Sequence, residues 1–181
     1  ESKEGIVCSP VKMWIEGMAL LLDRMKQENI DFSSIKAISG SAQQHATVFW
    51  SADEFPHSVY NVFKDPSSVT NDIPGLSISF SPIWRDSSTV FECNQLSEKK
   101  PAIWWRQTTG SLPTERFSGP QIARIMRVRK DEYSCTKRIS LASSFLCSLL
   151  LGEYAPIDLS DGSGMNILDL NTLDWSNEVL D

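Results

Sequence analysis

The sequence predicts an α/β fold. Several segments carry apolar residues at three- and four-residue steps, which is typical of amphipathic helices. Short β-branched or aromatic runs lie between them, so helices and strands alternate along the whole chain. The 181 residues, 41% hydrophobic and 22% charged, suit one domain or a large part of one. This composition excludes purely disordered, collagen-like and coiled-coil proteins.

The N-terminal part predicts one helix followed by two strands. Ser9 and Pro10 supply a cap and a first-turn proline for a helix over about 10 to 27, whose apolar positions recur at helical spacing. Short strands are expected at 35–39 and 47–50, because the first alternates weakly and the second is β-branched and aromatic. A polar turn separates the two strands.

The central part predicts a long loop and two helices. Residues 51–81 are rich in Asp, Pro, Ser and Asn, which favours an exposed loop that ends in a short strand at 76–80. Capping groups at 86–88 begin a helix through about Lys99. A proline breaks it, and a further short helix is expected over 102–108.

The C-terminal part predicts two more helices and a mixed tail. Ser118-Gly119-Pro120 begins one helix, and a second, closed by a glycine, runs from about 140 to 151. The tail then holds a Gly/Asp turn at 161–164, a short strand near 167–170 and a helix start at Ser176.

Charge and cysteine usage narrow the expected partners and location. The 17 basic and 23 acidic residues give a net charge of −6, so neither a nucleic acid nor a membrane is expected as a partner. No apolar run is long enough to cross a bilayer. The four cysteines follow no C-x-x-C spacing, which argues for reduced thiols and against a zinc site or disulfide framework. A cytoplasmic location is expected.

The common catalytic signatures are absent. The chain has no Gly-rich phosphate loop, no dinucleotide-binding glycine pattern, no metalloprotease helix motif and no nucleophile elbow. Only His45 and His57 could serve a Ser/His/Asp or Cys/His site, and neither lies near a recognisable nucleophile. The acidic residues near Gly162 lack the calcium-loop order of ligands, so a tight turn explains them better and no metal site is expected.

The first of two polar clusters occupies residues 39–47. Small residues there bring the backbone close to whatever fills a pocket, while Gln43, Gln44 and His45 supply amide and imidazole groups. Such groups suit a polyhydroxylated ligand. They could equally satisfy buried strand ends.

The second polar cluster occupies residues 109–117. Arg116 follows Glu115 beside the helix start at 118, where its guanidinium could donate a forked pair of hydrogen bonds to a ligand oxygen. It could also only pair with Glu115 or with the helix terminus.

Five motifs in the same order resemble the FGGY carbohydrate kinase family, and the match is close to its eukaryotic xylulose kinase branch. The matching runs are ISGSAQQH at 38–45, SPIWRDSST at 81–89, TGS at 109–111 with ERF at 115–117 and GPQI at 119–122, SLASS at 140–144, and DGSGMN at 161–166. The resemblance implies an incomplete ribonuclease-H-like (actin-like ATPase) domain, with a mixed sheet and flanking helices. Residues 1–181 would form the central part of the N-terminal sugar-binding domain, without the first phosphate hairpin and the C-terminal ATP-binding domain.

The resemblance also implies an activity for the full-length enzyme. It would phosphorylate D-xylulose to D-xylulose 5-phosphate with ATP and magnesium, as in pentose metabolism, and this chain would hold part of the sugar site. No cofactor is expected on this chain, which alone is expected to be inactive. Its partners would be D-xylulose or a related ketopentose and the remaining segments of the parent kinase. The alternatives are a family kinase for another pentulose and a non-catalytic sugar-binding fragment.

Carried over residue by residue, the resemblance places His45 and Arg116 on the sugar, with Gln44 and Asp86 at the same pocket. No catalytic residue is expected in the chain, since the family's general-base Asp would lie beyond its end. Two departures from the family pattern concern the substrate. Ala46 replaces the usual Gly and would tighten the pocket wall, and Leu112 replaces an Arg and would remove a phosphate or sugar contact.

Overall fold

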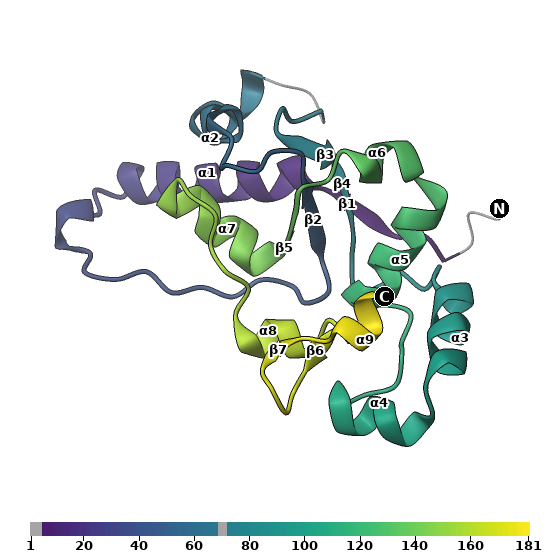
Figure 1. The fold of residues 1–181 in the computed structure, drawn as a ribbon. Helices are drawn as coiled ribbons and strands as arrows, with labels where there is room; N and C mark the ends of the chain where they lie inside the picture. The colour runs from purple at the N-terminus through teal and green to yellow at the C-terminus, as the bar shows by residue number, and fades with distance from the viewer. Residues whose placement is uncertain (1–4, 69–71) are drawn as a thin grey trace.

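Strand β2 (Thr47–Trp50) lies at the centre of the fold, and apolar layers cover both its faces (Figure 1). The computed structural model describes residues 5–68 and 72–181. All four residues of β2 are buried. It pairs with β3 (Leu76–Ile78) on one side and with β5 (Arg138–Leu141) on the other, so the sheet order is β3-β2-β5. Because side chains alternate along a strand, its residues divide between two cores.

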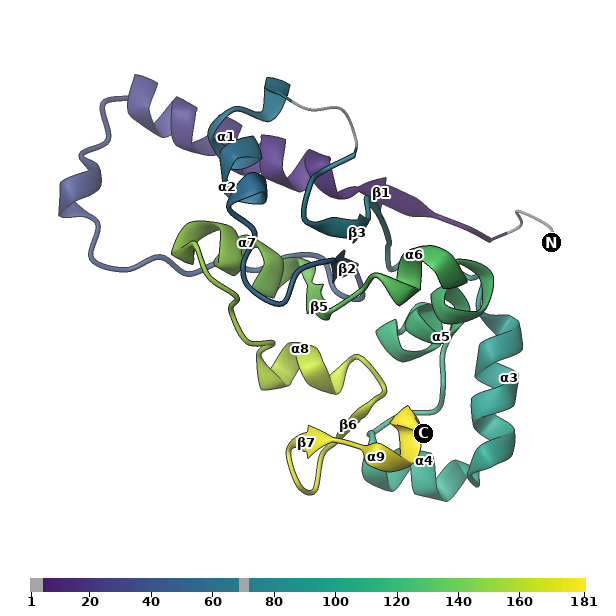
Figure 2. The same ribbon diagram turned by 45° about the horizontal axis from the view of Figure 1, so that its top comes forward.

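The first core lies between β2 and three helices, α1 (Val11–Gln27), α2 (His57–Lys64) and α7 (Ala142–Leu151). These helices lie together on one side of β2 in both views (Figures 1 and 2). Its buried members are Val11, Ile15, Val48, Trp50, Val59, Val62, Ile73, Phe145 and Leu149. Residues far apart in the sequence therefore meet in one cluster, which packs β2 against α7.

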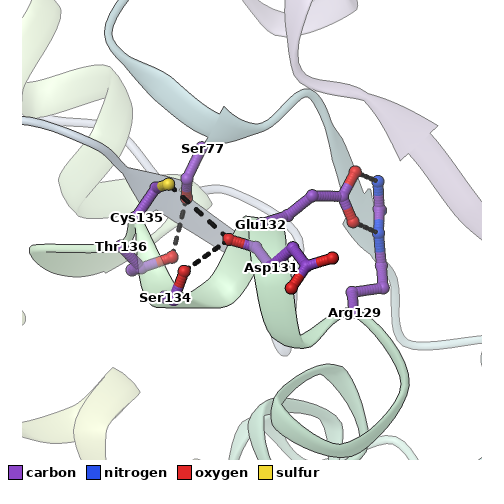
Figure 3. A network of polar contacts seen from close by, with 7 residues as sticks. All are labelled: Ser77, Arg129, Asp131, Glu132, Ser134, Cys135 and Thr136. Atoms are coloured by element: carbon purple, nitrogen blue, oxygen red, sulfur yellow. Dashed lines mark hydrogen bonds and ion pairs between the residues drawn. The ribbon is translucent and has the colours of Figure 1, made fainter.

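The second core lies on the opposite face, under α5 (Ser118–Val128) and α6 (Lys130–Ser134). Its buried members are Phe49, Ile78 and Ile125. Polar contacts join this layer to the sheet (Figure 3): the hydroxyl groups of Ser77 and Thr136 lie 2.7 Å apart. The ion pair between Arg129 and Glu132 in the same view is half-exposed, and pairs of that kind stabilise by less than about 1 kcal/mol.

The remaining elements lie around the central sheet (Figure 2). They are the helices α3 (Val90–Lys99), α4 (Ala102–Thr108), α8 (Leu159–Ser163) and α9 (Asn177–Leu180), the paired strands β1 (Cys8–Pro10) and β4 (Phe80–Pro82), the paired strands β6 (Leu168–Asp169) and β7 (Asp174–Trp175), and single 3-10 turns at Phe32–Ser34 and Pro66–Ser68. Two backbone bonds attach the C-terminal part, from Gly119 N–H to the Met165 carbonyl and from Leu170 N–H to the Thr108 carbonyl, both 2.8 Å.

The α/β prediction is confirmed, and helices with local start and stop signals match it most closely. α4 has the predicted bounds, α5 begins at Ser118, and α7 ends at Gly152, whose φ of 73° is the left-handed cap conformation that glycine adopts freely. The mixed sheet is not seen, because every strand pair among the described residues is antiparallel.

The predicted strand at 35–39 is wrong. The segment is unpaired in the described residues, and Ile38 is 68% exposed. A strand requires a hydrogen-bonded neighbour, which its own residues cannot supply. The strand predicted at 76–80 divides into β3 and β4, because Ser79 turns the chain from the central sheet toward β1.

Other differences arise where tertiary packing outweighs local composition. The predicted loop at 51–81 contains α2, whose Val59 and Val62 are buried in the first core. The predicted helix start at 140 is instead the end of β5, since pairing with β2 holds residues 138–141 extended. The predicted turn at 161–164 falls largely within the short helix α8.

Further expectations concern the N-terminus and the thiols. Pro10, not Ser9, is the residue before α1, because the β1–β4 ladder continues through Pro10, which pairs with Phe80. The four cysteines are free thiols, as predicted. Among the helices of residues 5–68 and 72–181, none combines the length and the hydropathy that a bilayer span requires.

Candidate sugar-binding site

A hollow of about 660 Å³ collects most of the predicted site residues. It lies where the turn before β2, the segment after β4, the start of α5 and the end of α8 come together. Its lining residues are Gln43, Gln44, His45, Trp84, Arg116, Phe117 and Gly164. The two polar clusters that the sequence singles out thus meet in one place.

His45 is held at the base of this hollow by backbone geometry and by an aromatic contact. Its φ of 61° is left-handed, a conformation that costs a non-glycine residue on the order of 1 kcal/mol or more. The imidazole packs against the Phe117 ring with centroids 4.9 Å apart. On its other side, a Cβ added to Gly164 would approach His45 Cε1 to 3.3 Å, so a glycine suits this close approach.

The surroundings of His45 favour its neutral form. Burial lowers the pKa of the imidazole below its ordinary value of 6.5, and the positive charge of Arg116 lowers it further. A hydrogen bond with the Gly164 backbone and the charge of Asp161 act in the opposite direction but do not outweigh them. At pH 7 the neutral ring has one donor and one acceptor nitrogen. The Gly164 backbone takes the donor, and the acceptor suits a hydroxyl group.

Replacing Arg116 with Gln is expected to raise the pKa of His45 toward 6.5, because the charge that disfavours the imidazolium is removed. An NMR titration of the His45 ring protons measures this. Since the folded pKa lies below the unfolded one, the contribution of His45 to stability is complete above pH 6.5 and is lost as the pH falls through the folded pKa. Arg85→Gln is the control, as Arg85 lines a neighbouring hollow. An equal shift in both variants, or none in Arg116→Gln, contradicts the prediction.

Arg116 lies between two hollows. With Trp84 it lines both the first one and a smaller one of about 300 Å³. The side chain is exposed, and within the described residues no ion pair or side-chain hydrogen bond involves it. The pairing with Glu115 that the sequence allows is therefore not formed, and the guanidinium donors are free for a ligand.

Asp86 lines the smaller hollow and is only 2% exposed. One carboxylate oxygen accepts from Val7 N–H at 2.7 Å, and the other accepts from the backbone and hydroxyl of Ser88 and from Gln121 Nε2 at 2.7 Å. These contacts join three separate parts of the chain. The predicted sugar-contacting role of Asp86 thus concerns a carboxylate whose two oxygens already have partners.

Three lining residues were not predicted as site residues: Trp84, Phe117 and Gly164. All three lie within the motif runs, and this position was the one signal that could have pointed to them. Aromatic residues and glycines are common in protein cores and turns, so their residue type alone does not predict a place in a binding site. Gln44, which was predicted, is exposed and lines the hollow.

Neither departure from the family pattern falls on the hollow's described lining. Ala46 is fully buried, so its methyl group packs inside the protein. Leu112 is 38% exposed and lies outside both hollows.

Hydrogen bonds join two of the motif runs, 161–166 and 109–111, next to the hollow. Asn166 donates through Nδ2 to Thr109 Oγ1 at 2.7 Å and to the Ser111 carbonyl at 3.0 Å, and its φ of 66° is left-handed. These contacts hold the segment containing Gly164 next to the loop that leads to Arg116. Their role here is to place backbone.

A larger hollow of about 710 Å³ lies between α5 and the C-terminal segment. Its lining is mainly apolar and includes Ile122, Met126 and Ile139, with Lys137 and Arg138 among the charged residues. None of the predicted site residues lines it.

Sequence and structure comparisons identify the relatives of this chain. No family profile matches it. A xylulose kinase from Rattus norvegicus is 42% identical over 181 residues, covering 97% of this chain and 33% of that protein. The fold of a xylulose kinase from Brucella ovis superposes with a TM-score of 0.77 at 21% identity, and that of a gluconate kinase from Lactobacillus acidophilus with 0.76 at 19%. These cover 99% and 100% of this chain and 32% of each of theirs.

The chain spans about a third of the length of the curated relatives it matches. The solved structures share its fold, but at this low sequence identity they give no information about the substrate. The sequence identity to plant and mammalian relatives is high over nearly all of its residues. The chain is therefore similar in sequence to xylulose kinases over about one third of their length.

Proposed function

We propose that the protein phosphorylates D-xylulose with ATP, giving D-xylulose 5-phosphate and ADP, and that the 660 Å³ hollow holds the sugar. The observation that carries this proposal is the meeting of His45 and Arg116, distant in sequence, at one hollow with aromatic walls. Relatives named xylulose kinase at 38–42% identity support the substrate.

The lining suits a ketopentose in chemical terms. A neutral imidazole, together with a guanidinium that has no partner among the described residues, can form several hydrogen bonds with neighbouring hydroxyl groups. The Trp84 and Phe117 rings give apolar surfaces for the C–H faces of a sugar. Gln44 adds amide groups at the rim.

In the proposed reaction, the terminal hydroxyl oxygen of the sugar forms a bond to the γ-phosphorus while the bond to the ADP oxygen breaks. Catalysis of phosphoryl transfer depends mainly on positioning and on charge stabilisation. His45 and Arg116 would contribute the first by holding the sugar in one pose. The hydroxyl proton would go to a base outside these 181 residues.

ATP and magnesium would be used by the full-length enzyme. Within residues 5–68 and 72–181, no three His, Cys, Asp or Glu side chains are grouped so that they could hold a metal ion. The proposed part of these residues in the reaction is to bind the sugar. A cytoplasmic location is part of the same proposal.

The expected result is that D-xylulose binds this chain saturably and that Arg116→Ala weakens binding by about 10- to 100-fold, since a guanidinium makes charge-assisted hydrogen bonds. His45→Ala is expected to weaken it by about tenfold. Isothermal titration calorimetry measures both. Arg85→Ala and His57→Ala are matched controls, because neither residue lines the hollow.

Sugar-dependent ADP release by the intact protein tests the reaction itself. Glycerol and gluconate are the competitors. Equal losses in the control variants, or absence of heat from the folded wild-type chain, would overturn the assignment of the hollow to the sugar.

A kinase for another polyol is the second candidate function. The gluconate kinase superposes as well as the xylulose kinase does, with TM-scores of 0.76 and 0.77, so the fold does not favour one substrate. A higher kcat/KM with another pentulose or with gluconate than with D-xylulose would favour this candidate.

A further inference from the structure

The carbonyl that precedes Arg116 is held by two buried side chains. Glu115 C=O accepts a hydrogen bond from Thr89 Oγ1 at 2.6 Å and another from Gln121 Nε2 at 2.9 Å. Thr89 is fully buried and Gln121 is 1% exposed. The peptide between Glu115 and Arg116 therefore has its orientation fixed from α5 and from the turn before α3.

The amide of Gln121 is itself clamped at a second point. The same Nε2 donates to Asp86 Oδ1 at 2.7 Å, so both of its hydrogens are engaged. Asp86 in turn is fixed by Val7 and Ser88. Gln121 has little freedom to rotate, because a turn of the amide would break a hydrogen bond to a buried carboxylate.

Arg116 depends on this arrangement, since its own side chain has no ion pair or side-chain hydrogen bond among the described residues. The local backbone therefore sets the direction in which the side chain leaves the chain. Phe117 N–H donates to the Thr114 carbonyl at 2.9 Å, and Gln121 N–H donates to the Phe117 carbonyl at 3.1 Å. The first bond closes the turn that contains the Glu115–Arg116 peptide, and the second joins that turn to α5.

We infer that Gln121 is a positioning residue, which directs Arg116 into the sugar-binding hollow. Its amide, anchored on the Asp86 carboxylate, donates to the Glu115 carbonyl and so holds the peptide that precedes Arg116. This inference rests on the proposed sugar-binding role of Arg116. It assigns the sugar no contact with Gln121, which does not line the hollow.

Gln121→Met tests this role, because it keeps the length of the side chain and removes the amide donors. We expect D-xylulose affinity to fall by about tenfold in calorimetry. Made in an Arg116→Ala background, the same substitution is expected to cause no further loss, since its effect passes through Arg116. Thr89→Val, which removes the other donor to the same carbonyl, is expected to follow the same pattern.

Ser77→Ala is the control, since it removes a hydrogen bond to Thr136 that lies outside the hollow. It is expected to lower stability without changing sugar affinity. An equal affinity loss from Gln121→Met with and without Arg116 would overturn the inference and leave a general structural role.

Hydrogen exchange separates this inference from the proposed function, because it needs no sugar. In Gln121→Met the amides at 114–117 are expected to exchange at least tenfold faster than in the wild type, with the amides of β2 unchanged. If wild-type chain binds no sugar but this exchange difference is present, the proposed function fails and the coupling of Gln121 to the Arg116 turn stands. Unchanged exchange at 114–117 overturns the coupling.

Discussion

Trp50→Ala is expected to lower the free energy of unfolding by about 3–5 kcal/mol, the range for removing a large buried aromatic side chain. The Trp50 ring is fully buried and packs against Phe55, Phe145 and Tyr154, with centroids 5.1–5.7 Å away. Its indole N–H also donates to Ser140 Oγ at 2.9 Å, so β2 and β5 are joined through it. The substitution thus leaves a cavity in the first core and an unpaired buried hydroxyl group.

Urea denaturation followed by circular dichroism measures this loss. Trp84→Ala is the matched control, because Trp84 is 51% exposed and its removal opens no buried cavity. Trp50→Phe is expected to lie between them, since it retains a ring but loses the hydrogen bond. A loss below about 1 kcal/mol in Trp50→Ala would show that this cluster is not the main core.

The sequence predicted those elements whose boundaries depend on neighbouring residues. Pro101 and Gly152 act within one turn of the helices that they bound, through a fixed φ and a left-handed cap. Such signals require no knowledge of the rest of the chain. The same holds for the strand at 47–50, whose four residues are buried.

Elements that depend on distant partners could not be predicted. β1 and β4 pair only because the fold brings Cys8–Pro10 next to Phe80–Pro82, and neither segment has a strong strand composition. β5 ends where a helix start was expected, at 140–141, because β2 supplies its hydrogen bonds. Conversely, Ile35–Ser39 has strand composition but no partner in the described residues.

The candidate site shows the same division. His45 and Arg116 were predicted as ligand residues from their chemistry and the resemblance, and the fold brings both to one hollow. The left-handed φ of His45 and the bonds that Gln121 makes could not be predicted, since they depend on Gly164, Phe117 and Asp86 from other elements. Asp86 itself remains a proposed sugar residue. Because its carboxylate also has partners within the protein, the stability of its variants must be measured together with their sugar affinity.

Asp86→Ala is expected to destabilise the fold by about 3 kcal/mol, because a buried carboxylate that serves several donors is removed at once. The substitution would remove the acceptor of Val7 N–H, Ser88 N–H and the Gln121 amide. Val7 and Gln121 lie far apart in the sequence, and Asp86 joins them. Thermal and urea unfolding measure the loss. Asp86→Asn is expected to lose less, since the amide oxygen can still accept from one side.

Asp31→Ala separates the buried contacts of Asp86 from its local turn. Asp31 accepts from the backbone and hydroxyl of Ser33 at 2.9 and 2.6 Å, the same local pattern and distances that join Asp86 to Ser88, but it lies on the exposed surface. A much smaller loss in Asp31→Ala would therefore assign the cost in Asp86→Ala to Val7 and Gln121. If Asp86→Asn instead leaves stability unchanged and removes sugar affinity, the carboxylate acts on the sugar directly, and Gln121 would position a ligand residue on each side of the hollow.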